Sequence, residues 1–101
     1  MVKHIVMWKL KENANGNSKE ANAKLMKEKI ESLKGKISGI NILEVGFNFS
    51  KNENHSDVVL YSEFKSKEDL DNYQIHPLHK ALIPFIMETT SERRLVDYET
   101  V

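Results

Sequence analysis

Residues 2–10 form an alternating segment whose two sides are both largely apolar, and this pattern restricts the fold more than any other feature of the chain. One side consists of Val2, His4, Val6, Trp8 and Leu10, and the other of Lys3, Ile5, Met7 and Lys9. A period of two residues predicts a β-strand. Because the middle of this strand is apolar on both sides, both faces of its sheet must be covered.

The remainder of the first half predicts a helix and a second strand. Apolar residues recur at helical spacing in Ala23, Met26, Ile30 and Leu33. We therefore expect a helix that begins after a cap at Ser18, follows a polar loop at residues 13–18, and runs to about Leu33. Residues 42–50 read as the second strand, and the polar run 51–56 reads as a turn.

The second half predicts two strands with a pair of helices between them. Residues 57–64 and 93–99 have strand patterns. Between them, Ser66 is a suitable cap for a helix over 67–73. Pro77 favours the start of another helix, which Pro84 must kink or end.

The resulting order is strand, helix, strand, strand, helix pair, strand. This order predicts one α+β domain over residues 1–101, with a ferredoxin-like four-stranded antiparallel sheet and its helices on one face. The second face of that sheet also carries apolar side chains. The same face of a second molecule is the simplest cover for it, so we predict a homodimer with sheets packed face to face.

Composition excludes several classes of partner and site. The chain has 15 lysines and arginines and 15 aspartates and glutamates, a balance that argues against nucleic acid or an anionic membrane as the main partner. It contains no cysteine, so disulfides and thiolate chemistry are excluded. No apolar run approaches the roughly 18 residues of a membrane span, and the first residues read as a strand rather than a signal peptide. We therefore expect a cytoplasmic protein.

The segment "YQIHPLH", residues 73–79, is the candidate functional site. A bend before Pro77 lets Tyr73 converge with His79, and a neutral imidazole beside a phenol can act as a general base next to a hydrogen-bond donor. His4 on the first strand points to the same place if it lies on the matching sheet face. The alternative is a purely structural bend in which His76 caps the second helix. The histidine spacing does not favour a metal site.

Three segments make the chain similar to a known family. The segments "VKHIVMWKLK", "SKEDLDNYQIHPLHKAL" and "LVDYE" resemble the stress-responsive A/B barrel (Dabb) domain family over essentially the whole chain. This resemblance implies a dimeric α+β barrel of ferredoxin-like topology. It also implies a catalytic role for Tyr73 and His79, because one family member is a cyclase that closes a linear polyketide without metal or cofactor.

The resemblance implies a site and several candidate functions. His79 would be the base and Tyr73 the donor, while His4, Val6, Trp8 and His76 would contact a small apolar or aromatic carbonyl ligand. We expect an uncharacterised homodimeric Dabb protein with a small-molecule pocket between sheet and helices and no cofactor. The alternatives are a cofactor-free cyclase or lyase of a polyketide-like carbonyl compound, a cofactor-independent monooxygenase, and a non-catalytic stress-stable assembly protein.

Overall fold

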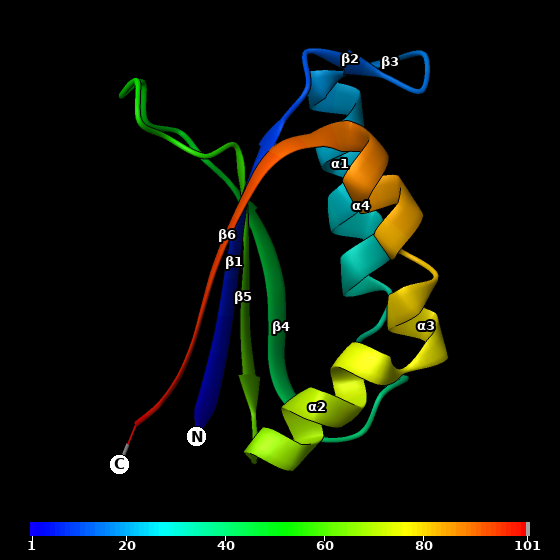
Figure 1. The fold of residues 1–101 in the computed structure, drawn as a ribbon, viewed down its shortest axis with the longest axis vertical. Coiled ribbons are helices and arrows are strands. Elements are labelled where there is room, and N and C mark those ends of the chain that lie inside the picture. The colour runs from blue at the N-terminus through cyan, green and yellow to red at the C-terminus, as the bar shows by residue number, and fades with distance from the viewer. Residues whose placement is uncertain (101) are drawn as a thin grey trace.

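The computed structural model describes residues 1–100 and places four strands in one antiparallel sheet (Figure 1). The order across the sheet is β4-β5-β1-β6. The strands are β1 Val2–Leu10, β4 Ile40–Phe47, β5 Val58–Phe64 and β6 Thr90–Glu99. This arrangement confirms the predicted ferredoxin-like α+β fold, in which the first and last strands are neighbours at the centre and edge of the sheet.

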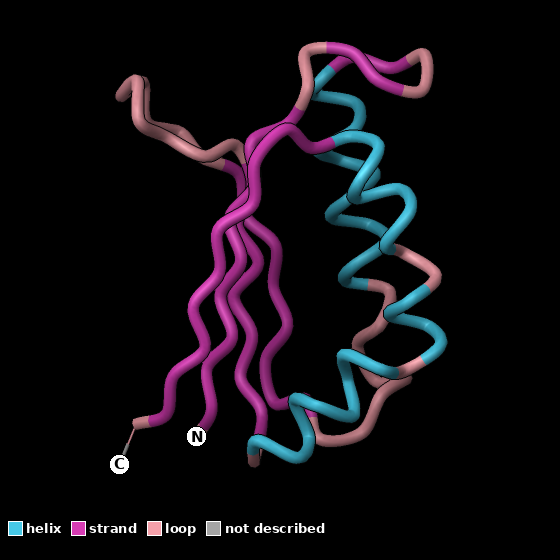
Figure 2. The backbone as a smooth tube through the Cα atoms, viewed as in Figure 1, coloured by secondary structure: helices cyan, strands magenta, loops and turns pink. Residues whose placement is uncertain are grey.

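The helices all lie on one side of the sheet, as the backbone trace shows (Figure 2). They are α1 Lys19–Glu31, α2 Lys67–Ile75, α3 Pro77–Lys80 and α4 Ile83–Thr89. The predicted caps are present: Ser18 Oγ accepts from Ala21 N at 3.2 Å, and Ser66 Oγ accepts from Asp69 N at 3.1 Å. No helix among residues 1–100 is long and apolar enough to cross a membrane.

The register of the sheet determines which side chains face the helices. In β1 and β6, His4 lies opposite Asp97, Val6 opposite Leu95 and Trp8 opposite Arg93. Paired residues in an antiparallel ladder point to the same side of the sheet. Because Val6 and Trp8 are buried under the helices, Asp97 and Arg93 project to the helix side as well.

The core lies between the sheet and the helices. Its buried strand residues are Val2, Val6, Trp8, Leu10, Leu43, Val45, Val58, Leu60 and Phe64. From the helices, Met26, Ile30, Leu70 and Tyr73 pack against them. The alternating burial along β1 and β5 matches the faces that the sequence predicted.

Several element boundaries differ from the sequence prediction. Helix α1 ends at Glu31, and Leu33 N donates to Ile30 O at 3.1 Å in a tighter final turn. Strand β4 spans Ile40–Phe47 rather than 42–50, and β6 begins at Thr90 rather than at 93. The helix that begins at Pro77 ends at Lys80, four residues before Pro84, which agrees with the prediction that Pro84 must kink or end it. Pro84 itself also starts a further helix. It stands in the first turn of α4, where its missing N–H costs no helical hydrogen bond.

The predicted polar loop at 13–18 contains a short hairpin of β2 Asn13–Ala14 and β3 Asn17–Ser18. Its two turn residues, Asn15 and Gly16, have φ angles of 54° and 76°. Positive φ at both positions is the requirement of a type I′ turn, for which Asn-Gly is the preferred pair. The prediction of a loop missed this signal.

The second sheet face carries no helix. Met7, Ile42, Val96 and Tyr98 project from it and are each 40–47% exposed. This exposed apolar surface is the face for which the sequence analysis predicts a second copy of the chain as the cover.

Candidate functional site

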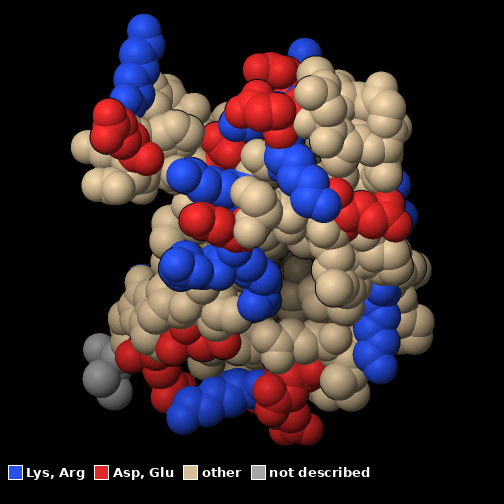
Figure 3. All heavy atoms as spheres, turned by 45° about the horizontal axis from the view of Figure 1, so that its top comes forward, with Lys and Arg blue, Asp and Glu red and all other residues tan. Residues whose placement is uncertain are grey.

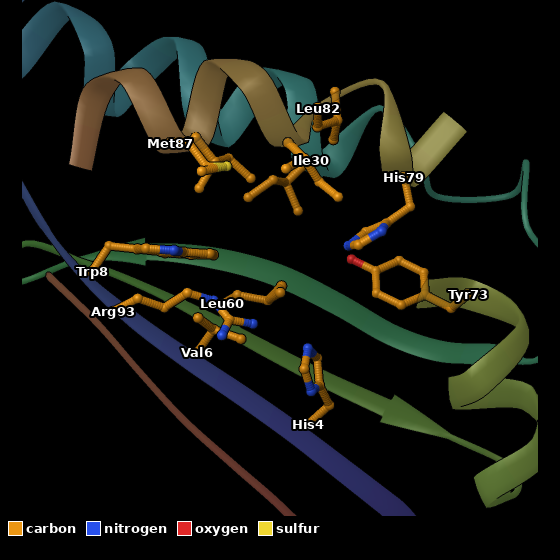
Figure 4. A pocket seen from close by; sticks show the side chains of 12 residues that line it. His4, Val6, Trp8, Ile30, Leu60, Tyr73, His79, Leu82, Met87 and Arg93 are labelled. Atoms are coloured by element: carbon orange, nitrogen blue, oxygen red, sulfur yellow. The ribbon is translucent and has the colours of Figure 1, made fainter. Parts of the chain in front are cut away.

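A cavity of about 380 Å³ lies between the helix-facing side of the sheet and helices α1–α4. The space-filling view shows a hollow in the surface between sheet and helices (Figure 3). Most of its wall is apolar: Val6 and Leu60 come from the sheet, and Ile30, Ile83 and Met87 come from the helices. His4, Tyr73, His79 and Arg93 supply the charged and hydrogen-bonding groups, and the close-up shows them at one end and one side of the space (Figure 4).

The bend at Pro77 brings Tyr73 and His79 together. Helix α2 ends at Ile75 and α3 begins at Pro77, so the chain turns between the two side chains. Their ring centroids are 4.5 Å apart. In Figure 4 the Tyr73 hydroxyl points toward the imidazole of His79. Tyr73 also packs against Phe64 at 5.1 Å, which holds its ring in the core.

The hydrogen bond of His79 determines which nitrogen can react. Its Nδ1 lies 3.1 Å from the carbonyl oxygen of Gln74. A carbonyl can only accept, so Nδ1 carries the proton and Nε2 keeps its lone pair. Burial lowers the pKa of His79 below its ordinary value of 6.5; the hydrogen bond to Gln74 O opposes this lowering, and the charge of Arg93 adds to it. The imidazole is therefore neutral at pH 7 and available as a base through Nε2.

Tyr73 has the complementary property. Its side chain is only 1% exposed, and this burial raises its pKa to about 12. The phenol therefore keeps its proton throughout the physiological range. A protonated phenol beside a neutral imidazole provides one hydrogen-bond donor and one base in the same corner of the cavity.

His4 reaches the same corner from β1. Its Nδ1 pairs with the carboxylate of Asp97 on β6, and Ser62 Oγ donates to its backbone carbonyl at 2.7 Å. The carboxylate accepts the Nδ1 proton, which leaves Nε2 for the cavity. The ring centroids of His4 and Tyr73 are 6.3 Å apart. The sheet face of His4, which the sequence left undetermined, is thus the helix-facing one.

Trp8 and Val6 form the floor of the cavity, together with Leu60. The indole nitrogen of Trp8 is buried and has no hydrogen-bond partner among the described residues. A buried N–H group that donates no hydrogen bond lowers the stability of the folded state. Because solvent does not reach this nitrogen, Trp8 contributes apolar surface to the cavity rather than a donor.

His76 lies outside the cavity. Its Nδ1 accepts from Leu78 N at 3.1 Å, so the side chain caps α3 directly before Pro77. Of the six residues expected to form the site, the cavity lining includes His4, Val6, Trp8, Tyr73 and His79, and it lacks His76. The capping alternative describes His76 correctly.

Sequence reasoning did not select Asp97 and Arg93. Both lie on β6 at positions that share a sheet side with His4 and Trp8. The predicted topology could have indicated both residues, because it makes the first and last strands neighbours in the sheet. No group of three or more His, Asp or Glu side chains among residues 1–100 is arranged to hold a metal ion.

Comparison with known proteins supports a single family. The family model described as the stress responsive A/B barrel domain matches residues 2–100. A search of curated proteins found no match.

Solved structures agree with this match. A dimeric protein of unknown function with a ferredoxin-like fold from Bacteroides fragilis is 40% identical, with a TM-score of 0.86 over 98% of this chain and 95% of that one. Hydroxynitrile lyase from Passiflora edulis is 14% identical, with a TM-score of 0.81 over 96% of this chain and 90% of the lyase. An antibiotic biosynthesis monooxygenase is 16% identical, with a TM-score of 0.74 over 100% and 99% of the two chains. At these two identities the similarity shows a common fold.

Proposed function

This chain belongs to the stress-responsive A/B barrel domain family, and from that premise we propose that it binds a small carbonyl compound and performs cofactor-free acid–base chemistry on it. The observation that carries the proposal is the state of His79. Its Nδ1–H is occupied by Gln74 O, its pKa is lowered, and its free Nε2 stands beside the protonated hydroxyl of Tyr73 in an apolar cavity.

The proposed reaction begins with removal of a proton from carbon. His79 Nε2 takes a proton from the carbon next to the substrate carbonyl, and the electrons of that C–H bond form an enolate. The enolate oxygen accepts a hydrogen bond from Tyr73, which stabilises negative charge where it develops. The imidazolium then returns its proton to the product, so the protein is unchanged after one turnover.

His4 and Asp97 assist at the same corner as positioning groups. The Asp97 carboxylate fixes the orientation of the His4 ring, with Nε2 directed to the space that Tyr73 and His79 share. A second polar group at this distance can hold a second oxygen of the substrate. The apolar remainder of the wall excludes water, which strengthens these polar contacts.

The proposal is tested by hydrogen exchange at carbon. Phenylacetone in ²H₂O, followed by proton NMR, reports removal of the α-proton without any assumption about the later steps. We expect His79→Ala to reduce the exchange rate by about 10²- to 10⁴-fold, the usual contribution of a general base. Tyr73→Phe should reduce it by about 10²-fold because the enolate loses its donor.

His76→Ala is the matched control, because it removes a histidine three residues away that caps α3 outside the cavity. It should exchange at the wild-type rate. An equal rate in wild type and His79→Ala, with circular dichroism unchanged, would contradict the proposal. In that case the segment at 73–79 is a structural bend, and a role in assembly becomes the better explanation.

We also propose that the protein is a homodimer formed through the open sheet face. The relative from Bacteroides fragilis, 40% identical, is described as dimeric, and so is a structural neighbour from Thermobifida fusca. The open face exposes Met7, Ile42, Val96 and Tyr98, and a second copy of the same surface is a self-complementary cover. Light scattering should give twice the chain mass of 11.7 kDa.

A further inference from the structure

Arg93 places a guanidinium on the wall of the cavity. It stands on β6 opposite Trp8, and it is one of the lining residues. In Figure 4 its side chain runs along the cavity floor beside Val6 and Leu60, from the sheet side opposite Met87. Arg94, the next residue, is paired with Met7 and therefore points to the open face.

This guanidinium has no anionic partner in the structure. None of the ion pairs among residues 1–100 includes Arg93. The lining of the cavity contains no aspartate or glutamate, and Asp97 is already paired with His4. Arg93 is exposed, so its unpaired donors are accessible to an anion from solution, and the apolar wall beside it favours an anion that also has an apolar part.

Two further observations indicate the size and the contacts of that anion. An apolar cavity of about 150 Å³ holds benzene, and the cavity here is about 380 Å³, which leaves room for one ring with short substituents. Trp8, the residue directly opposite Arg93, contributes apolar surface to the same part of the wall.

We propose that Arg93 is the specificity residue of the site and selects a single-ring carboxylate, whose carboxylate it binds while the other end of the molecule reaches Tyr73 and His79. A carboxylate fits better than a phosphate, because one planar guanidinium satisfies a carboxylate in bidentate fashion, whereas a phosphate dianion needs further cations. This inference rests on the proposed function for the role of Tyr73 and His79, but the binding step stands on Arg93 alone.

The test is a set of isothermal titrations with three ligands of similar shape: phenylacetate, phenylacetamide and phenyl phosphate. Wild type should bind phenylacetate at least about 10-fold more tightly than the neutral amide, the effect of one charge-assisted contact. Arg93→Gln should remove that preference and leave the affinity for the amide unchanged. Arg93→Lys should restore part of it, because the charge returns without the bidentate geometry.

Arg94→Gln is the matched control, because it removes the same charge one residue away on the opposite sheet face. Its titrations should equal those of wild type. Equal affinity for acid and amide in wild type, or an unchanged preference in Arg93→Gln, would overturn the inference. Tighter binding of phenyl phosphate than of phenylacetate would overturn the choice of a carboxylate.

The two proposals fail separately. Suppose that Arg93→Gln loses the preference for phenylacetate, while His79→Ala exchanges the α-proton of phenylacetone at the wild-type rate. The cavity then binds carboxylic acids, but His79 is not the base. If His79→Ala is inactive while Arg93→Gln keeps its preference for phenylacetate, His79 is the base and Arg93 is not the specificity residue. Circular dichroism of each variant confirms that the fold is intact.

Discussion

On the helix-facing side of β1, Val6 and Trp8 are at most 3% exposed, whereas Met7 between them, on the opposite side, is 40% exposed. The same contrast recurs in β5, where Val58 and Leu60 are buried and Val59 between them is half-buried. One face is covered by the helices of its own chain, and the other is not covered by any helix among residues 1–100. Apolar residues at strand positions therefore predict that a sheet face is buried, but they do not identify the element or molecule that covers it.

The helix-covered face also differs from the open face in its polar content. Among its buried residues are His4, which pairs with Asp97, and Ser62, whose Oγ donates to the backbone carbonyl of His4. A buried polar group costs stability unless it is hydrogen-bonded. The covered face therefore combines a packed apolar core with a mostly apolar cavity that has a polar corner at His4, and both differ from the open face.

Phe64→Ala should give the largest change in stability. The ring is fully buried on the covered face and packs between His4 and Tyr73. Its loss should lower the free energy of unfolding by about 3–5 kcal/mol, because the transfer free energy is lost and a cavity remains. Urea denaturation measures this change. Tyr98→Ala is the control on the open face, and a cost as large as that of Phe64→Ala at low protein concentration would remove the contrast between the faces.

Val96→Glu should affect the assembly rather than the fold. Val96 is 47% exposed on the open face and is paired with Ile5 of β1. In the proposed homodimer, two new carboxylates are buried without partners, which should raise the dimer dissociation constant by about 100-fold or more. Analytical ultracentrifugation measures this constant. If the Val96→Glu protein has the same dimer dissociation constant as wild type, the open face is not the interface.

The sequence predicted the covered face well because the relevant information is local. Alternation in residues 2–10 placed Val6 and Trp8 together, Ser18 and Ser66 marked the helix starts, and Pro77 marked the bend between Tyr73 and His79. Each of these signals acts over a few residues, where backbone sterics and capping decide the conformation.

The parts that were missed depend on distant or competing contacts. The pair of His4 and Asp97 joins residues 93 positions apart, and it required the register of two strands. Strand β4 ends at Phe47 because Asn48 bonds the backbone of Ser50 and offers the chain an alternative to the ladder. Pro84 was predicted only to kink or end the helix before it, and the separate helix α4, which begins beside this proline and packs over the cavity, was not predicted.

The pH dependence of stability gives the smallest predicted effect and belongs to the covered face alone. Because burial lowers the pKa of His79 in the folded protein, the folded state binds its proton less readily than the unfolded chain, whose pKa is near 6.5. This contribution to stability is complete above that value and is lost as the pH falls through the lower folded pKa. Urea denaturation at pH 7.5 and pH 5 should therefore show a larger loss in wild type than in His79→Asn, which keeps a donor for Gln74 O but does not titrate. Other groups titrate in both proteins and cancel in the comparison. An equal loss in the two proteins would mean that His79 is solvated as freely in the folded state as in the unfolded chain, and that burial beside the cavity does not lower its pKa.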